Sequence, residues 1–321
     1  MKKILTVNSH TGWHYLLSKT GKKIDVVNGW NFKNRKLPDN FVLKDEKDIK
    51  ISDYDILILH RMFHDAKYIL LNLFYRKRII LVFHGRKSRQ TKNVVRKFIK
   101  YSYFKLINLF KDLLKLEYVF ITPCVKESWS VTGEVIMPGI PLEDFIPYHK
   151  KRFASKLDLH SVAIVGNYLN RSHFSLENLE ILTNAGFKIT LIGRGNSKLK
   201  RKGIEVLEPQ SYEEYLNELS KYSFYFSVLN EPEEGFNLSL LEAMAMGLVV
   251  ITHNHPTSPI RHKFNGIIYY SKNDLIKKME FLKNITVEEY NRMSINAHNT
   301  IKIWFPIEAF TENWIRILDE K

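Results

Sequence analysis

The stretch EGFNLSLLEAMAMGLVVIT, residues 234–252, predicts a helix that is followed at once by a buried strand. Asn237 is a good N-cap for a helix over about 238–246, and Gly247 suits the left-handed residue that ends it. The run LVVIT is apolar without alternation, which is typical of a strand covered on both faces. A helix joined to such a strand is the repeating unit of a parallel α/β sheet.

Short apolar runs alternate with helical stretches along the rest of the chain. The predicted strands are Ile4–Val7, Ile24–Val27, Ile56–Leu59, Ile79–Phe83 and Val119–Ile121, then Val162–Val165, Lys188–Ile192, Phe224–Val228 and Leu248–Ile251. Between the two sets, PGIPLEDFIPYHKKRFASK holds three prolines and a charged run without a period, and we interpret it as a linker. This pattern predicts two doubly wound, Rossmann-like parallel-sheet domains facing across a cleft, over residues 1–148 and 149–305.

Charge is distributed unevenly between these domains. Residues 1–150 hold 28 Lys and Arg against 14 Asp and Glu, whereas residues 151–321 hold 21 against 20. A field of one sign on one domain steers anions toward it. The partners that fit are an anionic membrane surface, a polyanionic acceptor or nucleic acid, unless the surface is simply rich in lysine.

Composition excludes several classes of protein. Cys124 is the only cysteine, so neither an intrachain disulfide nor a multi-thiolate zinc site can form. The apolar run in MKKILTVNSH is too short for a signal peptide, and no charge-free apolar run is long enough to span a bilayer. We expect a cytoplasmic protein, either free or peripherally bound to the cytoplasmic face of a membrane.

The loops that follow the strands of the second domain are rich in polar residues and glycine. Gly166 and Asn167 follow one strand, and Gly193-Arg194-Gly195 follow the next. Ligands of open parallel sheets bind at the carboxyl ends of the strands. The sequence therefore predicts a polar ligand at this edge.

Two glutamates flank the helix start at Asn237. Backbone N–H groups of Leu238 and Ser239 at the start of this helix would favour an anion such as a diphosphate. Glu234 precedes the helix and Glu242 lies on it, so their carboxylates could accept hydrogen bonds from the hydroxyls of a sugar and of a ribose. The alternative is that Glu242 is an exposed helix glutamate and that Glu234 only complements the dipole at the helix start.

The run EGFNLSLLEAMAMGLVVIT, followed by PTSPI and NGIIYY, resembles the donor-binding half of the retaining glycosyltransferases of family 4, which have the GT-B fold. VIMPGIPLEDFIP resembles the interdomain segment of that family, and SDYDILILH and ILVFHG resemble two strands of its first domain. The closing FPIEAFTENWIRILDEK resembles a helix, at about 306–321, that packs back on the first domain. The resemblance covers most of the chain.

The resemblance implies that a sugar is transferred with retention from a UDP- or GDP-sugar to a membrane-associated or polyanionic acceptor, in the synthesis of glycans, glycolipids or cell-surface polysaccharides. The first domain would bind the acceptor and the second the donor. Glu234 and His84 would contact the transferred sugar, and Gly12 would let the first loop approach the phosphates. The residues that it places at the donor are Gly12, Asn167, His173, Gly193, Arg194, Gln210, Gly235, Phe236, Asn237, Leu238, Ser239 and Glu242.

The sequence departs from the family at the expected phosphate cations. Where family members place an Arg and a Lys, this chain has Asn167 and His173, so Arg171 is the guanidinium expected to replace them as a catalytic group. Two alternatives stay open. One is a DNA-modifying glycosyltransferase, and the other is an inactive GT-B protein that binds a nucleotide-sugar.

A basic stretch between residues 86 and 115 contains one acidic residue, Asp112. Ile99, Tyr103, Leu106, Phe110 and Leu113 recur within it at helical spacing, which predicts an amphipathic helix. Such a helix either lies on an anionic membrane or packs its apolar stripe on its own domain. The cations predicted to face the membrane or acceptor are Arg86, Lys87, Arg89, Lys92, Arg96, Lys97 and Lys100.

We predict no metal ion and no other cofactor. Asp53-Tyr54-Asp55 matches a metal-binding D-x-D motif, but it precedes a strand instead of following one. His253 and His255 lack a third ligand nearby in the sequence. The oligomeric state cannot be predicted from the sequence.

Overall fold

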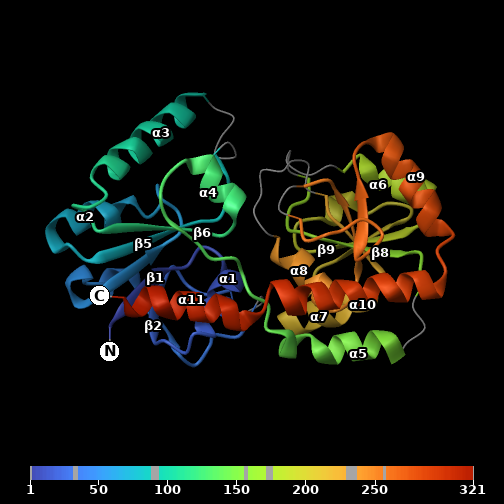
Figure 1. Cartoon of the computed structure of the whole chain (residues 1–321), viewed down its shortest axis with the longest axis horizontal. Helices are drawn as coiled ribbons and strands as arrows, with labels where there is room; N and C mark the ends of the chain where they lie inside the picture. The colour runs from blue at the N-terminus through green and yellow to red at the C-terminus, as the bar shows by residue number, and fades with distance from the viewer. Residues whose placement is uncertain are drawn as a thin grey trace. The chain divides into compact units, whose positions relative to one another are not determined.

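The computed structural model describes residues 2–31, 35–87, 94–154, 158–170, 176–228, 237–255 and 258–320 (Figure 1). The chain forms two compact units. The first contains residues up to 139 together with the segment from 307 onward, and the second contains the described residues between 140 and 306. Each unit is an α/β fold with its own sheet.

The first unit has a seven-stranded sheet in the order β3-β2-β1-β4-β5-β6-β7, and its neighbouring strands all pair in parallel. Its strands are β1 (Ile4–Val7), β2 (Ile24–Val27), β3 (Phe41–Leu43), β4 (Ile56–Leu59), β5 (Arg78–Phe83), β6 (Leu116–Phe120) and β7 (Glu134–Val135). Its helices are α1 (Thr11–Ser18), α2 (Ala66–Tyr75), α3 (Val94–Leu109), α4 (Pro123–Trp129) and α11 (Ile307–Asp319). The strand order reverses between β1 and β4, which creates a topological switch point there.

The second unit has a six-stranded parallel sheet in the order β10-β9-β8-β11-β12-β13. Its strands are β8 (Ser161–Val165), β9 (Lys188–Ile192), β10 (Ile204–Leu207), β11 (Phe224–Phe226), β12 (Val249–His253) and β13 (Gly266–Tyr269). Its helices are α5 (Ile146–Ala154), α6 (Asn178–Asn184), α7 (Tyr212–Leu219), α8 (Leu238–Ala245), α9 (Lys272–Lys283) and α10 (Val287–Trp304). Here the switch point lies between β8 and β11.

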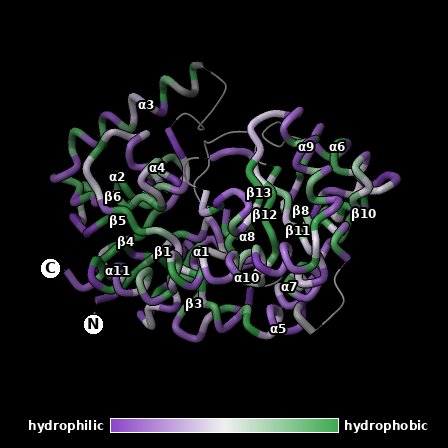
Figure 2. Tube along the Cα trace, turned by 45° about the vertical axis from the view of Figure 1, so that its right-hand side comes forward, coloured by the Kyte–Doolittle hydropathy of each residue, from purple (hydrophilic) through white to green (hydrophobic). Residues whose placement is uncertain are grey.

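Helices cover both faces of the second sheet, and successive residues of a strand enter opposite cores. Val249 and Ile251 of β12 pack with Leu179 and Met279, from α6 and α9, in one core. Val250 packs in the other core with residues of α7, α8 and α10. The prediction of doubly wound parallel sheets is therefore confirmed, and Figure 2 shows the strands of both units as hydrophobic segments.

The predicted linker is partly wrong, because residues 146–154 form helix α5. Ile140 and Phe145 belong to a core of the second unit. Arg152 of α5 is buried and donates hydrogen bonds to the Ser220 carbonyl and the Tyr290 hydroxyl. These contacts place the division between the units at 139/140, before the predicted boundary at 148/149.

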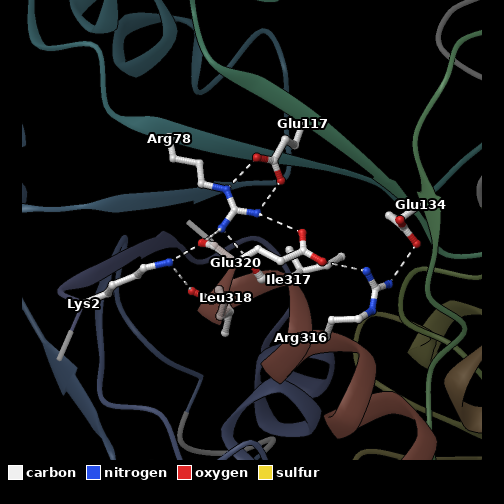
Figure 3. Close-up of polar contacts among 8 residues, drawn as sticks. All are labelled: Lys2, Arg78, Glu117, Glu134, Arg316, Ile317, Leu318 and Glu320. Carbon is white, nitrogen blue, oxygen red and sulfur yellow. Dashed lines mark hydrogen bonds and ion pairs between the residues drawn. The ribbon is translucent and has the colours of Figure 1, made fainter.

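Helix α11 closes the first unit, and polar contacts fix its end (Figure 3). Arg78 of β5 forms a bidentate pair with Glu117 of β6, with N–O distances of 2.5 and 2.6 Å, and also donates to the Ile317 carbonyl. Arg316 bridges Glu134 and Glu320 at 3.0 and 2.9 Å. Trp314 is fully buried, so α11 adds an aromatic side to the core of the first unit.

Candidate functional site

Helix α8 begins at the carboxyl edge of the second sheet, next in the chain after β11 at the switch point. Asn237 caps it as predicted, since its Oδ1 accepts the Ser239 N–H at 3.0 Å, and Gly247 follows the helix with a positive φ of 81°. The Ser239 N–H was predicted to face an anion, but it donates its hydrogen bond to the Asn237 side chain. The Leu238 amide makes no hydrogen bond with any residue that the structure describes. It is the donor left for an anion at this helix start.

Glu242 lies one turn farther along α8 and is buried, with 6% of its surface exposed. One of its oxygens accepts a hydrogen bond from the Tyr212 hydroxyl at 2.9 Å, and the other accepts one from Tyr215 at 3.0 Å. Burial, together with the neighbouring carboxylate, raises the pKa of Tyr215 well above its usual value, so this hydroxyl stays protonated and donating. The interpretation of Glu242 as a surface glutamate is therefore wrong. A buried, oriented carboxylate suits the binding of hydroxyl groups.

The loops after β8 and β9 are tied together at the same edge. Asn167 accepts the Arg194 N–H at 2.9 Å, and Asn196 donates to the carbonyls of Gly166 and Gly193 at 2.7 and 2.9 Å. Gly193 has φ 140°, and a side chain there would place its Cβ 2.4 Å from the Gly166 carbonyl oxygen. The loop therefore requires glycine at this position.

The loop after β10 carries Gln210 at the same edge of the sheet. Its backbone N–H donates to Glu214 at 2.6 Å and its side chain donates to the Glu208 carbonyl at 2.8 Å. The structure thus gathers Asn167, Gly193, Arg194, Gln210, Asn237, Leu238, Ser239 and Glu242 along one edge of the second unit. The predicted residues Arg171, His173, Glu234, Gly235 and Phe236 lie outside the described residues.

In the first unit, the switch point holds a cluster of histidines around β1. His60 directly follows β4, His84 directly follows β5, and His14 lies on α1. Thr6 Oγ1 lies 3.0 Å from His14 Nε2 and 3.3 Å from His60 Nε2. His60 Nδ1 lies 2.9 Å from His84 Nε2. These four residues form a continuous hydrogen-bonded chain.

The direction of this chain follows from its end at His14. His14 Nδ1 lies 3.1 Å from the His10 carbonyl oxygen, which can only accept, so Nδ1 carries the proton. The neutral ring then leaves Nε2 as an acceptor for the Thr6 hydroxyl. The Thr6 hydroxyl also donates to the Ile58 carbonyl at 3.1 Å. Its single proton therefore points toward His14 or Ile58 and not toward His60.

Continuing from Thr6, the network assigns a tautomer to each of the other rings. The Thr6 oxygen accepts from His60 Nε2–H, so His60 Nδ1 accepts from His84 Nε2–H. His84 is then left with an unprotonated Nδ1. The chain therefore presents His84 Nδ1 as a hydrogen-bond acceptor.

Burial keeps these rings neutral. Desolvation lowers the pKa of His84 to about 3 and that of His14 to about 4, and it lowers the pKa of His60 well below its usual value. Trp13 packs against all three rings, with centroid distances of 4.7 to 5.4 Å, and Trp314 of α11 packs against Trp13. These aromatic rings shield His14 and His60, which are buried, whereas His84 is only partly buried.

A cavity of about 250 Å³ lies beside His84 in the first unit. His60, Phe63, His64 and Lys100 are among the residues that line it. The Lys100 ammonium also lies 5.1 Å from the centre of the Phe63 ring. The cavity thus combines a neutral acceptor with a cation, a combination that suits a hydroxyl group near an anionic group.

The structure corrects one prediction here. Gly12 does not lie in an open loop but in the first turn of α1, where it is buried, and His10 caps that helix. Of the predicted basic residues, Arg86 and Lys87 follow β5 and Lys100 lines the cavity. Arg89 and Lys92 lie outside the described residues, as do the side chains of Arg96 and Lys97.

The sequence interpretation missed several residues of these sites. His60 ends a motif that was noticed, but its link to His84 through space was not predicted. Tyr212 and Tyr215 lie on α7, and no spacing in the sequence connects them with Glu242 on α8. Within the described ranges, no group of three or more His, Cys, Asp and Glu residues is placed to hold a metal ion.

One family model matches part of the second unit. Residues 160–284, within the second unit, match the family model described as Glycosyl transferases group 1. No curated protein matches the chain in sequence.

Several solved structures are similar over nearly the whole chain. Anabaena HepE in complex with UDP-glucose has a TM-score of 0.75 and 11% identity, covering 99% of each chain. Sucrose-phosphate synthase from Thermosynechococcus elongatus has a TM-score of 0.72 and 13% identity, covering 99% of this chain and 98% of its own. An α-glucosyltransferase in complex with UDP and a 13-mer DNA has a TM-score of 0.66 and 13% identity, covering 99% and 100%. The predicted GT-B fold is confirmed.

Proposed function

We propose that this protein is a retaining glycosyltransferase that takes a UDP- or GDP-sugar on its second unit. Its acceptor is membrane-associated or polyanionic and binds the first unit. The match of the second unit to group 1 glycosyl transferases and the GT-B fold support the proposal. Since HepE was solved with UDP-glucose, a uridine nucleotide is the first donor to test.

One observation carries the donor site: Glu242 is buried between two tyrosine hydroxyls, one turn below the Leu238 amide, which has no partner among the residues that the structure describes. Burying a carboxylate costs free energy, and the two tyrosine hydrogen bonds offset part of that cost and fix the orientation of the group. Both arrangements lie at the switch point, where open α/β sheets bind their ligands. In the proposal, the diphosphate docks at the Leu238 amide and the ribose hydroxyls donate to Glu242.

The proposed chemistry needs little from the protein beyond position and charge. In front-face substitution, the departing diphosphate oxygen takes the acceptor proton while the acceptor oxygen attacks the anomeric carbon. The helix start stabilises the negative charge of the leaving group, and Arg171 is the cation proposed to assist it. Glu234 contacts the transferred sugar in this proposal. No metal ion takes part.

On the first unit, the cavity beside His84 and Lys100 is the proposed acceptor site. His84 Nδ1, kept unprotonated, accepts a hydrogen bond from a sugar hydroxyl, while Lys100 faces a negative group of the acceptor. His84 thereby positions a hydroxyl and carries no charge of its own.

Glu234→Gln and Glu242→Gln test the donor site. Each should lower transfer by more than about 100-fold, because a carboxylate acceptor for donor hydroxyls is lost. Thermal unfolding is measured alongside, since Glu242→Gln also changes the hydrogen bonds from Tyr212 and Tyr215. Glu213→Gln, which changes an exposed glutamate on the neighbouring α7, is the matched control. Full activity in both site variants would refute the site. Addition of a chelator should leave transfer unchanged.

Two rival functions predict different results in binding and transfer assays. A DNA-modifying enzyme is suggested by the neighbour solved with DNA, and it would bind duplex DNA with a steep dependence on salt. An inactive scaffold would bind the nucleotide-sugar but neither transfer nor hydrolyse it. Donor binding measured by calorimetry, together with transfer assays, separates these cases.

A further inference from the structure

We propose that α2 and the outer side of α3 form a surface that docks on an anionic lipid bilayer and inserts its apolar side chains there. The inference rests on the proposed function for its purpose, since it selects a membrane-borne acceptor over a soluble polyanion. The surface itself is defined by exposure and charge. We call it the α2–α3 face, and its apolar members are Leu70, Leu71, Leu73, Phe74, Tyr75, Val95, Phe98, Ile99, Leu106, Leu109, Phe110 and Leu113.

Helix α3 does not bury the apolar stripe that its sequence predicts. Phe104 and Ile107 are buried in the first unit, and these two form its inner side. The stripe from Ile99 through Leu106 to Leu113 lies outside, apart from Tyr103, whose ring packs on Phe63. The structure thus contradicts the alternative that this stripe packs on its own domain.

Helix α2 adds a second apolar patch that the sequence interpretation did not predict. Tyr68, Ile69 and Asn72 face the core, but Leu70 and Phe74 are exposed, Phe74 to 83%. No charged residue interrupts the helix between Lys67 and Arg76. Of the six residues 70–75, all except Asn72 are large apolar or aromatic residues with exposed side chains.

The two patches lie on neighbouring segments of the first unit. Asn72 of α2 donates a hydrogen bond to the carbonyl of Leu114, just beyond α3, at 2.9 Å. Figures 1 and 2 agree that the carboxyl end of α3 descends toward α2, and Figure 2 shows hydrophobic segments on both helices. Leu109, which is 77% exposed, lies five residues before Leu114, and Phe74 lies two residues after Asn72, so exposed apolar side chains occur on both of these neighbouring segments. Exposed apolar patches of this kind mark sites of interaction.

The cations that border the α2–α3 face favour an anionic bilayer as its partner. Arg76, Lys77, Lys105 and Lys115 border it, and none forms an ion pair with a residue that the structure describes. Asp112 is the only acid in residues 94–115. Apolar side chains flanked by cations fit an anionic bilayer, where both contribute. A second copy of the chain would bring the same cations together, and nucleic acid would gain nothing from the apolar residues.

No described helix is long and apolar enough to cross a membrane, so the docking is interfacial. Phe74 and Leu109 insert into the acyl boundary, and the flanking lysines meet lipid phosphates.

Vesicle sedimentation of the full chain tests the inference. We would use vesicles of phosphatidylcholine with about 30% phosphatidylglycerol, and vesicles of phosphatidylcholine alone, at about 0.15 M salt. The wild type should partition at least about tenfold more strongly to the anionic vesicles, and Phe74→Ser with Leu109→Ser should lower that partition at least about tenfold. Lys105→Gln with Lys115→Gln should weaken binding to anionic vesicles only.

Ile276→Ser with Ile303→Ser is the matched control, because these two isoleucines are also exposed but lie on α9 and α10 of the second unit. This variant should bind vesicles like the wild type. UDP-glucose binding, measured on the same samples, should stay unchanged in every variant. If the wild type does not bind UDP-glucose, the proposed function fails while the test of the α2–α3 face still stands.

Absence of vesicle binding by the wild type, or equal binding by the Phe74 and Leu109 variant, would overturn the inference. A dimer in sedimentation velocity that the same variant dissociates, without vesicle binding, would assign the face to a second copy of the chain and would also overturn it.

Discussion

The two switch points of this molecule occupy the same place in their sheets but use opposite chemistry. Beside β1 and β4, buried histidines are kept neutral and linked in one direction from His84 to His14. Beside β8 and β11, the Leu238 amide at the start of α8 and the loop glycines accompany a buried carboxylate, Glu242. A doubly wound sheet places ligands at this edge, whereas the side chains there decide whether charge or neutral hydroxyl groups are bound.

The comparison suggests a division of labour. The second switch point suits a charged diphosphate with its ribose, and the first suits a neutral hydroxyl. Changes at one site should leave the binding role of the other intact, and the following predictions, from the largest expected effect to the smallest, test that independence.

Gly193→Ala should have the largest effect. Its Cβ would lie 2.4 Å from the Gly166 carbonyl oxygen, at a φ of 140° that other residues rarely adopt, so the loop must move. We expect nucleotide-sugar affinity to fall by more than about 100-fold, with a loss of about 2–4 kcal/mol in unfolding free energy. Calorimetry and denaturant titration measure both quantities.

Gly186→Ala is its matched control. Gly186 also has a positive φ, of 90°, but no atom lies within 4 Å of the added Cβ. This variant should lose only about 1 kcal/mol in unfolding free energy and keep its donor affinity. Equal donor affinity in the two variants would remove the β9 loop from the donor site.

Lowering the pH should destabilise the first unit through its histidines. The pKa of His14 is about 4 and that of His84 about 3 in the folded protein, whereas unfolded histidine titrates near 6.5. The unfolded state therefore binds more protons, so stability is full above about pH 6.5 and falls as the pH drops toward 4. At pH 5 each ring should cost about 2 kcal/mol.

Chemical denaturation at pH 7, 6 and 5 measures this slope. His14→Gln should flatten it by about 2 kcal/mol over the interval, whereas His160→Gln, which removes a partly exposed ring of the second unit, is the matched control and should not. An unchanged slope in His14→Gln would show that this ring is not kept neutral by burial.

His60→Phe should interrupt the chain and release His84. We expect nitrogen-15 NMR to show His84 protonated at Nε2 in the wild type and as a mixture of tautomers in the variant. Transfer should slow about tenfold with little change in the KM for the donor, because the donor site lies in the other unit.

His64→Gln provides the control for this experiment, since His64 lines the same cavity but has no place in the chain. It should leave the His84 tautomer unchanged. A single Nε2–H tautomer that persists in His60→Phe would contradict the relay.

Tyr215→Phe should have the smallest effect. Glu242 would lose one of its two tyrosine donors while remaining on α8, so donor affinity should fall about three- to tenfold. Tyr270→Phe, at an exposed tyrosine, should leave the affinity unchanged. Calorimetric titration with UDP-glucose would detect the difference, and equal affinities would show that the carboxylate does not depend on its tyrosines.

Much of the fold could be predicted from the sequence, because central strands of a parallel sheet are buried on both faces and appear as continuous apolar runs. β1, β2, β4 and β9 begin and end at the predicted residues. The strands that were missed are β3, β7, β10 and β13, and each lies at an edge of its sheet. β7 is only two residues long and β10 has the mixed sequence IEVL, so neither leaves a continuous apolar run. β13, with the sequence GIIY, is apolar and mostly buried but was not recognised as a strand.

Features of the sites could be predicted only where all the residues involved lie in one segment of the sequence. The cap and end of α8 follow from local residue preferences, so Asn237 and Gly247 were correctly assigned. The partners of Glu242 and of His84 come from other elements, and the topology alone brings them together. Likewise, helical spacing identified the stripe on α3, but the choice between core and solvent depends on what the unit offers for packing.

The most direct test of the account is a crystal structure with UDP-glucose bound. The account predicts density for the diphosphate at the first turn of α8, beside the Leu238 amide, with the ribose hydroxyls within hydrogen-bond distance of Glu242. Density for the nucleotide elsewhere, or a diphosphate far from that helix start, would contradict it.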